Sequence, residues 1–199
     1  MRKIIAAFPG VITWRAVAAL LDLDAGRPDR ARDAVSSLVS HDLSAIPRNA
    51  NWLITLAILG ELCGSLGAAD LAAPLYPALL AHADRHVAIG LSIASYGSVE
   101  RYLGLVAKAT GGLDAAAEHL ARAVESNESA GALPWAAHAR QELAEVLLAR
   151  GASGDRRQAL ELSTRARSDA ESLGMVVVAR RARALEEELR RPIPIRSRA

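Results

Sequence analysis

The chain contains few aromatic residues and only one cysteine. Phe, Trp and Tyr together make up 4% of its 199 residues, whereas Ala alone occupies 42 positions. Ala is the strongest helix former, and strands favour aromatic and β-branched side chains, so the composition predicts an all-α fold. Cys63 has no cysteine to pair with, which excludes the small disulfide-stabilised secreted class and indicates a reducing, cytoplasmic location.

Long apolar runs are missing as well. No stretch of 18 uncharged apolar residues occurs, so we expect no membrane-spanning helix. The N-terminus starts with basic residues as a signal peptide does, but Pro9 and Gly10 interrupt its apolar run and Arg15 follows. We therefore do not expect a secretory leader.

Excess charge is confined to the C-terminal end of the chain. The net charge is +2, and residues 175–199 contain seven Arg against Glu186, Glu187 and Glu188. Aromatic residues do not alternate with these arginines, and the glutamates lie at helical spacing from them. A solvated helix face is the preferred interpretation, with DNA contact as the alternative, so nucleic acid is not among the expected partners.

A pattern of Gly and Ala recurs along the chain. Four segments each run from a Gly to an Ala, and their Ala residues are 41, 44 and 43 positions apart: Ala31, Ala72, Ala116 and Ala159. A second small residue precedes each of these by 12 to 15 positions: Ala19, Gly60, Gly104 and Ala144. Two small residues at this spacing let two helices joined by a tight turn approach closely, and stacked helix pairs then form a common core.

The pattern predicts a right-handed α-solenoid of about four antiparallel helix pairs plus a C-terminal capping helix. We expect one repeat domain over residues 1–191 and a disordered tail or linker over 192–199. Pro74 and Pro77 should kink or shorten the helix that contains them, and Gly97 should bend another. The expected helices cover residues 11–24, 28–40, 50–66, 69–83, 89–110, 113–127, 134–149, 155–173 and 175–191.

The central repeats resemble a known family. The spacing of Leu59, Gly60, Ala72, Tyr76 and Leu79 is similar to that of tetratricopeptide repeats (TPRs), as is the spacing of the corresponding residues from 103 to 123. Members of that family carry an apolar–Gly pair on the first helix of each repeat and a close-packing Ala on the second. The period here is longer than the usual 34 residues, and repeats one and four have Ala in place of Gly.

A broader resemblance extends over residues 8–175. The runs F-P-G-V-I-T-W-R, P-R-N-A-N-W-L, Y-G-S-V-E-R-Y-L-G, N-E-S-A-G-A-L-P-W and R-G-A-S-G-D resemble the C-terminal helical region of bacterial signalling ATPases. Such proteins include cyclase-linked ATPases and LuxR-type transcription regulators. The resemblance implies a protein-interaction and regulatory module, either excised from such a protein or acting in trans.

Catalytic signatures do not appear in the sequence. It contains no phosphate-binding Gly-rich loop, G-x-S-x-G, H-E-x-x-H or C-x-x-C motif, so we expect neither an enzyme nor a bound cofactor. His82, Asp84 and His86 have the spacing of metal ligands, but histidines near a helix C-terminus are favoured without any metal. Cys63 is interpreted as a buried structural thiol rather than a nucleophile.

The first helices of successive repeats should line the concave inner face of the stack. This face is expected to be apolar in repeats one and two and polar in repeats three and four. Arg101 and Lys108 lie two helical turns apart and are candidates for holding a carboxylate or phosphate of a partner. The alternative is that they form ion pairs within the chain, with Glu145 or Glu61. The full candidate set is Trp52, Glu61, Tyr96, Ser98, Arg101, Lys108, His138, Gln141 and Glu145.

Two functions follow from this face. In the first, it binds a polypeptide: a peptide segment, another domain of a larger regulator, or a second copy of the chain. In the second, a closed pocket where Trp52, Tyr96, Arg101, His138 and Gln141 converge makes the protein a small-molecule sensor or an enzyme. An open groove favours the first function and an enclosed cavity the second.

Overall fold

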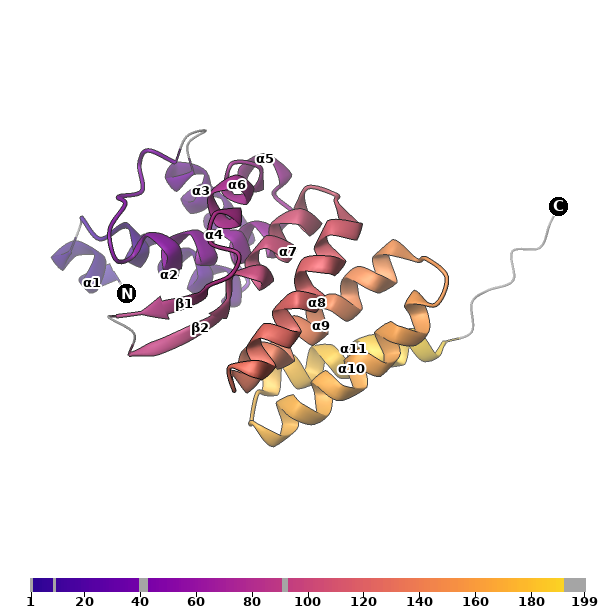
Figure 1. The fold of residues 1–199 in the computed structure, drawn as a ribbon. Coiled ribbons are helices and arrows are strands. Elements are labelled where there is room, and N and C mark those ends of the chain that lie inside the picture. Colours follow the sequence, from indigo (N-terminus) through magenta and orange to yellow (C-terminus); the bar gives the residue numbers. More distant parts are fainter. Residues whose placement is uncertain (1, 9, 40–42, 91–92, 192–199) are drawn as a thin grey trace.

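The computed structural model describes residues 2–8, 10–39, 43–90 and 93–191 (Figure 1). Helices contain 72% of the residues, which confirms the expectation of a mainly helical protein. Among the described residues, no helix is both long enough and apolar enough to cross a membrane. The tail predicted for residues 192–199 lies outside the described residues.

The N-terminal part contains α1 (Arg2–Ala7), α2 (Ile12–Asp24), α3 (Pro28–Leu38), α4 (Trp52–Leu66), α5 (Ala69–Ala72) and α6 (Leu75–Leu80). Of these, α1 was not anticipated from the sequence. The single helix predicted for residues 69–83 is divided into α5 and α6, with Pro74 as the residue before α6. A proline lacks the backbone N–H that would continue the helix, which agrees with the shortening expected there.

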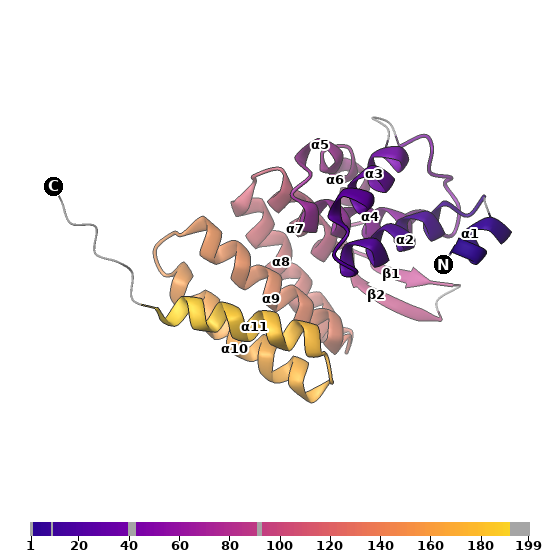
Figure 2. The same ribbon diagram turned by 180° about the vertical axis from the view of Figure 1, so that it is seen from behind.

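The C-terminal part contains α7 (Val99–Ala109), α8 (Leu113–Ser129), α9 (Leu133–Arg150), α10 (Asp155–Ser172) and α11 (Val176–Arg190). These helices pack side by side in chain order, and short turns reverse the direction between them (Figures 1 and 2). The turn between α8 and α9 contains Gly131 at φ +66°, a conformation that glycine adopts without steric cost. Their positions match the helices predicted from residue 113 onward within a few residues.

A two-stranded antiparallel hairpin replaces the first half of the helix expected over residues 89–110. Its strands are β1 (His86–Ile89) and β2 (Ala94–Ser98). Gly97 has φ +82°, and a Cβ atom there would lie 2.8 Å from Trp135 Cβ. A helix through this glycine is therefore excluded, and the chain becomes helical only at Val99. The all-α expectation is wrong for these residues.

Two clusters of buried side chains form the core. The first extends from Ala16 to Val106, and the second from Ala107 to Leu189, so they adjoin within α7. Tyr76 packs against both clusters. Gly60 and Gly104 lie where helices approach most closely: a Cβ on Gly104 would be 2.6 Å from Leu120 Cγ. The small residues found in the repeat thus mark contacts between helices.

Candidate functional site

A buried group of charges links α4, α7 and α9. Arg101 of α7 has a side chain only 1% exposed. Its Nε donates to Glu142 Oε2 at 2.8 Å, and its Nη2 lies 2.5 Å from Glu142 Oε1 and 3.0 Å from Glu61 Oε1. Each charge is therefore compensated by a partner on a neighbouring helix. These contacts use the donors of Arg101 that we considered available for an acidic partner.

Aromatic rings surround the Arg101 guanidinium. The rings of Tyr102 and Trp135 lie 5.2 and 5.7 Å from its Cζ, within cation–π range. Tyr96 stacks on Tyr102, with ring centroids 5.7 Å apart, and His138 stacks on Trp135 at 5.5 Å. These rings bring Tyr96, Arg101 and His138 into one cluster, as the second functional hypothesis expected.

The cluster also holds the hairpin in place. Tyr96 Oη donates to Glu61 Oε2 at 2.9 Å, and Trp135 Nε1 donates to the carbonyl of Ser95 at 3.0 Å. Ser98 is buried, and its backbone N–H donates to Asn127 Oδ1 at 2.9 Å. Side chains from α4, α8 and α9 thus fix the strands, so β2 is a preorganised wall rather than a free loop.

Electrostatics in the cluster follow from burial and from Arg101. Burial raises the pKa of Glu61, but the attraction and hydrogen bond of Arg101 outweigh it, so the pKa falls below its usual value. For Glu142, burial outweighs the same attraction and raises the pKa. Burial, with repulsion from Arg101, lowers the pKa of His138 to about 3. His138 is therefore a neutral ring at neutral pH.

A second set of ion pairs joins α7, α9 and α11. Glu145 of α9 accepts from Lys108 Nζ at 3.0 Å and from Arg181 Nη2 at 2.8 Å. Gln141 Nε2 lies 3.4 Å from the same carboxylate. The structure thus contains both intramolecular pairs considered from the sequence, Arg101 with Glu61 and Lys108 with Glu145.

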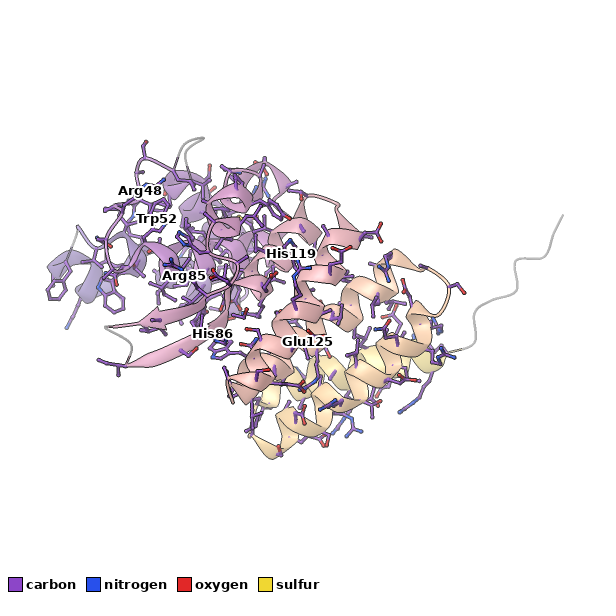
Figure 3. All side chains as sticks on the ribbon, viewed as in Figure 1. Arg48, Trp52, Arg85, His86, His119 and Glu125 are labelled. Carbon is purple, nitrogen blue, oxygen red and sulfur yellow. The ribbon has the colours of Figure 1, made fainter. Side chains whose placement is uncertain are left out.

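Trp52 lies apart from these groups. It begins α4, and the Arg48 guanidinium lies 4.6 Å above its ring (Figure 3). It is buried in the N-terminal core. Of the residues expected to converge in a pocket, Tyr96, Arg101 and His138 form one cluster, whereas Gln141 contacts the Glu145 group and Trp52 packs elsewhere.

An apolar pocket of about 330 Å³ lies between α2, α4 and the hairpin. Trp14, Val17 and Leu20 line it from α2, Ile54 and Ile58 from α4, and Ile89 and Tyr96 from the strands. The expected apolar half of the inner face included Thr13, Leu20 and Ile54, and all three line this pocket. Its contribution from Ile89 was missed because residues 89–98 were expected to be helical.

The missed charge partner, Glu142, had a signal in the sequence. Arg101 is 40 residues from Glu61 and 41 from Glu142, close to the repeat length. Opposite charges one repeat apart lie on equivalent helices of neighbouring pairs, so a search at that spacing would have found both partners.

The other reactive residue types do not form a site in the described part of the chain. His86 belongs to β1, and its Nε2 lies 3.0 Å from Ser126 Oγ, beside α8 (Figure 3). No group of three His, Cys, Asp or Glu side chains able to hold a metal ion occurs among the described residues. Cys63 is buried, and burial raises the pKa of its thiol to about 12, so it is a poor nucleophile.

Comparison of the chain with known protein families, with curated protein sequences and with solved structures gave no match.

Proposed function

We propose that the chain is a TPR-like interaction and regulatory module that binds a polypeptide partner through the apolar pocket between α2, α4 and the hairpin. In this proposal the helix pairs form a right-handed solenoid of the kind that the sequence resembles in bacterial signalling ATPases and transcription regulators. The partner is a peptide segment or a neighbouring domain, and the module works in the cytoplasm.

The pocket is the observation that supports the proposal most. The charged residues of the inner face pair with one another, so they are already occupied, whereas the apolar lining faces an unfilled space of about 330 Å³. Filling it with an aliphatic or aromatic side chain removes apolar surface from water, the main source of affinity in most protein associations. The exposed neighbour Ile93 extends this apolar surface along the hairpin.

The walls of the pocket suit a binding role because they are fixed beforehand. Tyr96 lines the pocket and at the same time donates to Glu61, which pairs with Arg101. A preformed wall lowers the ordering cost of binding, so affinity depends on the fit of the anchor side chain.

A direct test compares two substitutions on the hairpin. Ile89 lines the pocket and is 39% exposed, whereas Ile93 is 87% exposed and does not line it. Peptides are selected from a random library on the wild-type chain and then measured against I89E and I93E. We expect selected peptides to share an apolar anchor, to lose at least about tenfold in affinity for I89E, and to bind I93E almost normally.

The size of the pocket also favours the second function. A volume of about 330 Å³ lies at the lower end of the range for small-molecule sites. A library of small apolar compounds is therefore tested on the same two variants. Compounds that bind the wild type and not I89E, with no peptide that discriminates between the variants, would contradict the polypeptide proposal and support a small-molecule sensor.

A further inference from the structure

The turn between α8 and α9 recurs 43 residues later, between α10 and α11. The N–H of Ala132 donates to the carbonyl of Asn127 at 2.8 Å, and the N–H of Met175 donates to that of Ala170 at the same distance. Gly131 and Gly174 have φ +66° and +69°. The residues around the two turns are therefore structurally equivalent, and what covers the first turn indicates what fits the second.

An ion pair at the first turn is covered by α10. Arg140 of α9 pairs with Glu128 of α8, and its side chain is only 4% exposed. Two residues of α10 complete the contact: Asp169 accepts from Arg140 at 2.6 Å, and Arg165 pairs with Glu128 at 3.0 Å. Leu173, just beyond α10, lines the same depression as Leu133. The covering helix thus presents a base, an acid and an aliphatic residue at successive intervals of four.

The same ion pair is open at the second turn. Glu171 and Arg183 are the counterparts of Glu128 and Arg140, and they pair at 3.0 Å. Here the arginine side chain is 66% exposed. Beside the pair is a groove of about 470 Å³, lined by Met175 and by Val176, which is 75% exposed. Charge and apolar surface are arranged as at the first turn, with no helix of the described chain over them.

We infer that this groove at the α10–α11 turn, defined by Glu171, Met175, Val176, Ala179, Arg180 and Arg183, docks a helix of a partner protein. The partner helix presents a basic residue to Glu171, an acidic residue four positions later to Arg183, and an aliphatic residue four positions after that to Val176. The site lies at the opposite end of the molecule from the apolar pocket (Figure 2), and its existence does not depend on the function proposed there.

The occupant is not α10 of a second copy, because its Arg165 and Asp169 are already engaged with Glu128 and Arg140. Residues 192–199 of this chain contain no Asp or Glu to pair with Arg183. Farther along α11, Glu187 and Arg190 stand where α9 has Ala144 and Leu147. This polar substitution limits the contact to the first turns of α11 and favours a reversible partner over a permanently stacked helix pair.

The natural covering helix supplies the probe. A labelled peptide of residues 155–173 carries the required residues, and a cross-link between positions 157 and 161, both exposed in α10, keeps it helical. Its binding to the full chain is followed by fluorescence anisotropy. In the swapped peptide, Asp replaces Arg165 and Arg replaces Asp169. In the swapped protein, Arg replaces Glu171 and Glu replaces Arg183.

We expect the wild-type chain to prefer the natural peptide by about tenfold, since two ion pairs turn into two repulsions. The swapped protein should reverse this preference. Val176→Ser should weaken binding, whereas Val177→Ser should not, because Val177 neighbours it on α11 without lining the groove. All four substituted side chains are solvent-exposed, so circular dichroism should show unchanged folding.

Three results would overturn the proposal: no binding of the cross-linked peptide, binding without the charge reversal, or equal effects of Val176→Ser and Val177→Ser. Sedimentation of the wild-type chain gives a further check. A dimer that Val176→Ser abolishes would assign the groove to self-association instead of a partner helix.

Discussion

Replacing Gly104 with Ala tests the close contact between α7 and α8. The added Cβ would lie 2.6 Å from Leu120 Cγ, 3.0 Å from Leu120 Cδ2 and 3.2 Å from the backbone oxygen of Ala116. Overpacking of this kind costs about 1–3 kcal/mol, whereas the better helix propensity of Ala returns about 1 kcal/mol. We therefore expect Gly104→Ala to lower the free energy of unfolding by about 1–2 kcal/mol, and Gly104→Leu to lower it by several.

Gly60→Ala is the matched control. Its Cβ would lie 3.3 Å from Val106 Cγ2, a terminal methyl group that can move, and 3.5 Å from Tyr102 Cβ. The gain in helix propensity should then dominate, leaving this variant unchanged or up to about 1 kcal/mol more stable.

Urea denaturation followed by far-ultraviolet circular dichroism measures both variants, with the m-value checked for constancy. Because Leu120 supplies the colliding atoms, Leu120→Ala should cost less in the Gly104→Ala background than in the wild type. The packing described for α7 and α8 would be refuted if Gly104→Ala were as stable as Gly60→Ala, or if the two substitutions at positions 104 and 120 were additive.

Three further predictions concern buried groups. Arg101→Met should cost about 3–5 kcal/mol of stability in urea titrations, because it leaves two buried carboxylates without their cation, whereas Lys108→Met removes a part-exposed pair and should cost at most about 1 kcal/mol; equal losses would contradict the burial of Arg101. The folded state holds the pKa of His138 at about 3, below its ordinary 6.5, so between these pH values only the unfolded chain gains the proton and stability falls as the pH drops. His138→Gln should flatten this dependence by up to about 1.4 kcal/mol per pH unit, and an unchanged slope would show that the ring titrates normally. Cys63 is buried with a raised thiol pKa, so a thiol reagent should modify it only at the rate of unfolding; rapid modification of the native chain would disprove its burial.

The helices could be predicted because their signals are local. Gly and Ala at fixed intervals mark the turns and close contacts, and α8 to α11 begin and end within a few residues of the expected positions. The hairpin could not be predicted in this way. Its conformation depends on Asn127 and Trp135, which bond to residues 29 and 40 positions earlier. Such distant contacts override the helical pattern of a short segment.

The candidate site was predicted in part for the same reason. Arg101 and Lys108 were identified from their spacing on one helix, and their ion pairs with Glu61 and Glu145 were among the alternatives considered. The second carboxylate, Glu142, and the ring of Trp135 join the cluster only when helices one repeat apart are packed together. The apolar pocket needed Ile89 in a strand, so its full outline was not available from the periodicity of the helices.

The most direct test of the polypeptide-binding proposal is a methyl NMR titration of the wild-type chain with a peptide selected on it. The proposal predicts that the methyl signals of Val17, Leu20, Ile54, Ile58 and Ile89 shift together, whereas those of the neighbouring Leu21 and Ile93 change little. Shifts centred on other methyl groups, with the pocket signals unmoved, would contradict it.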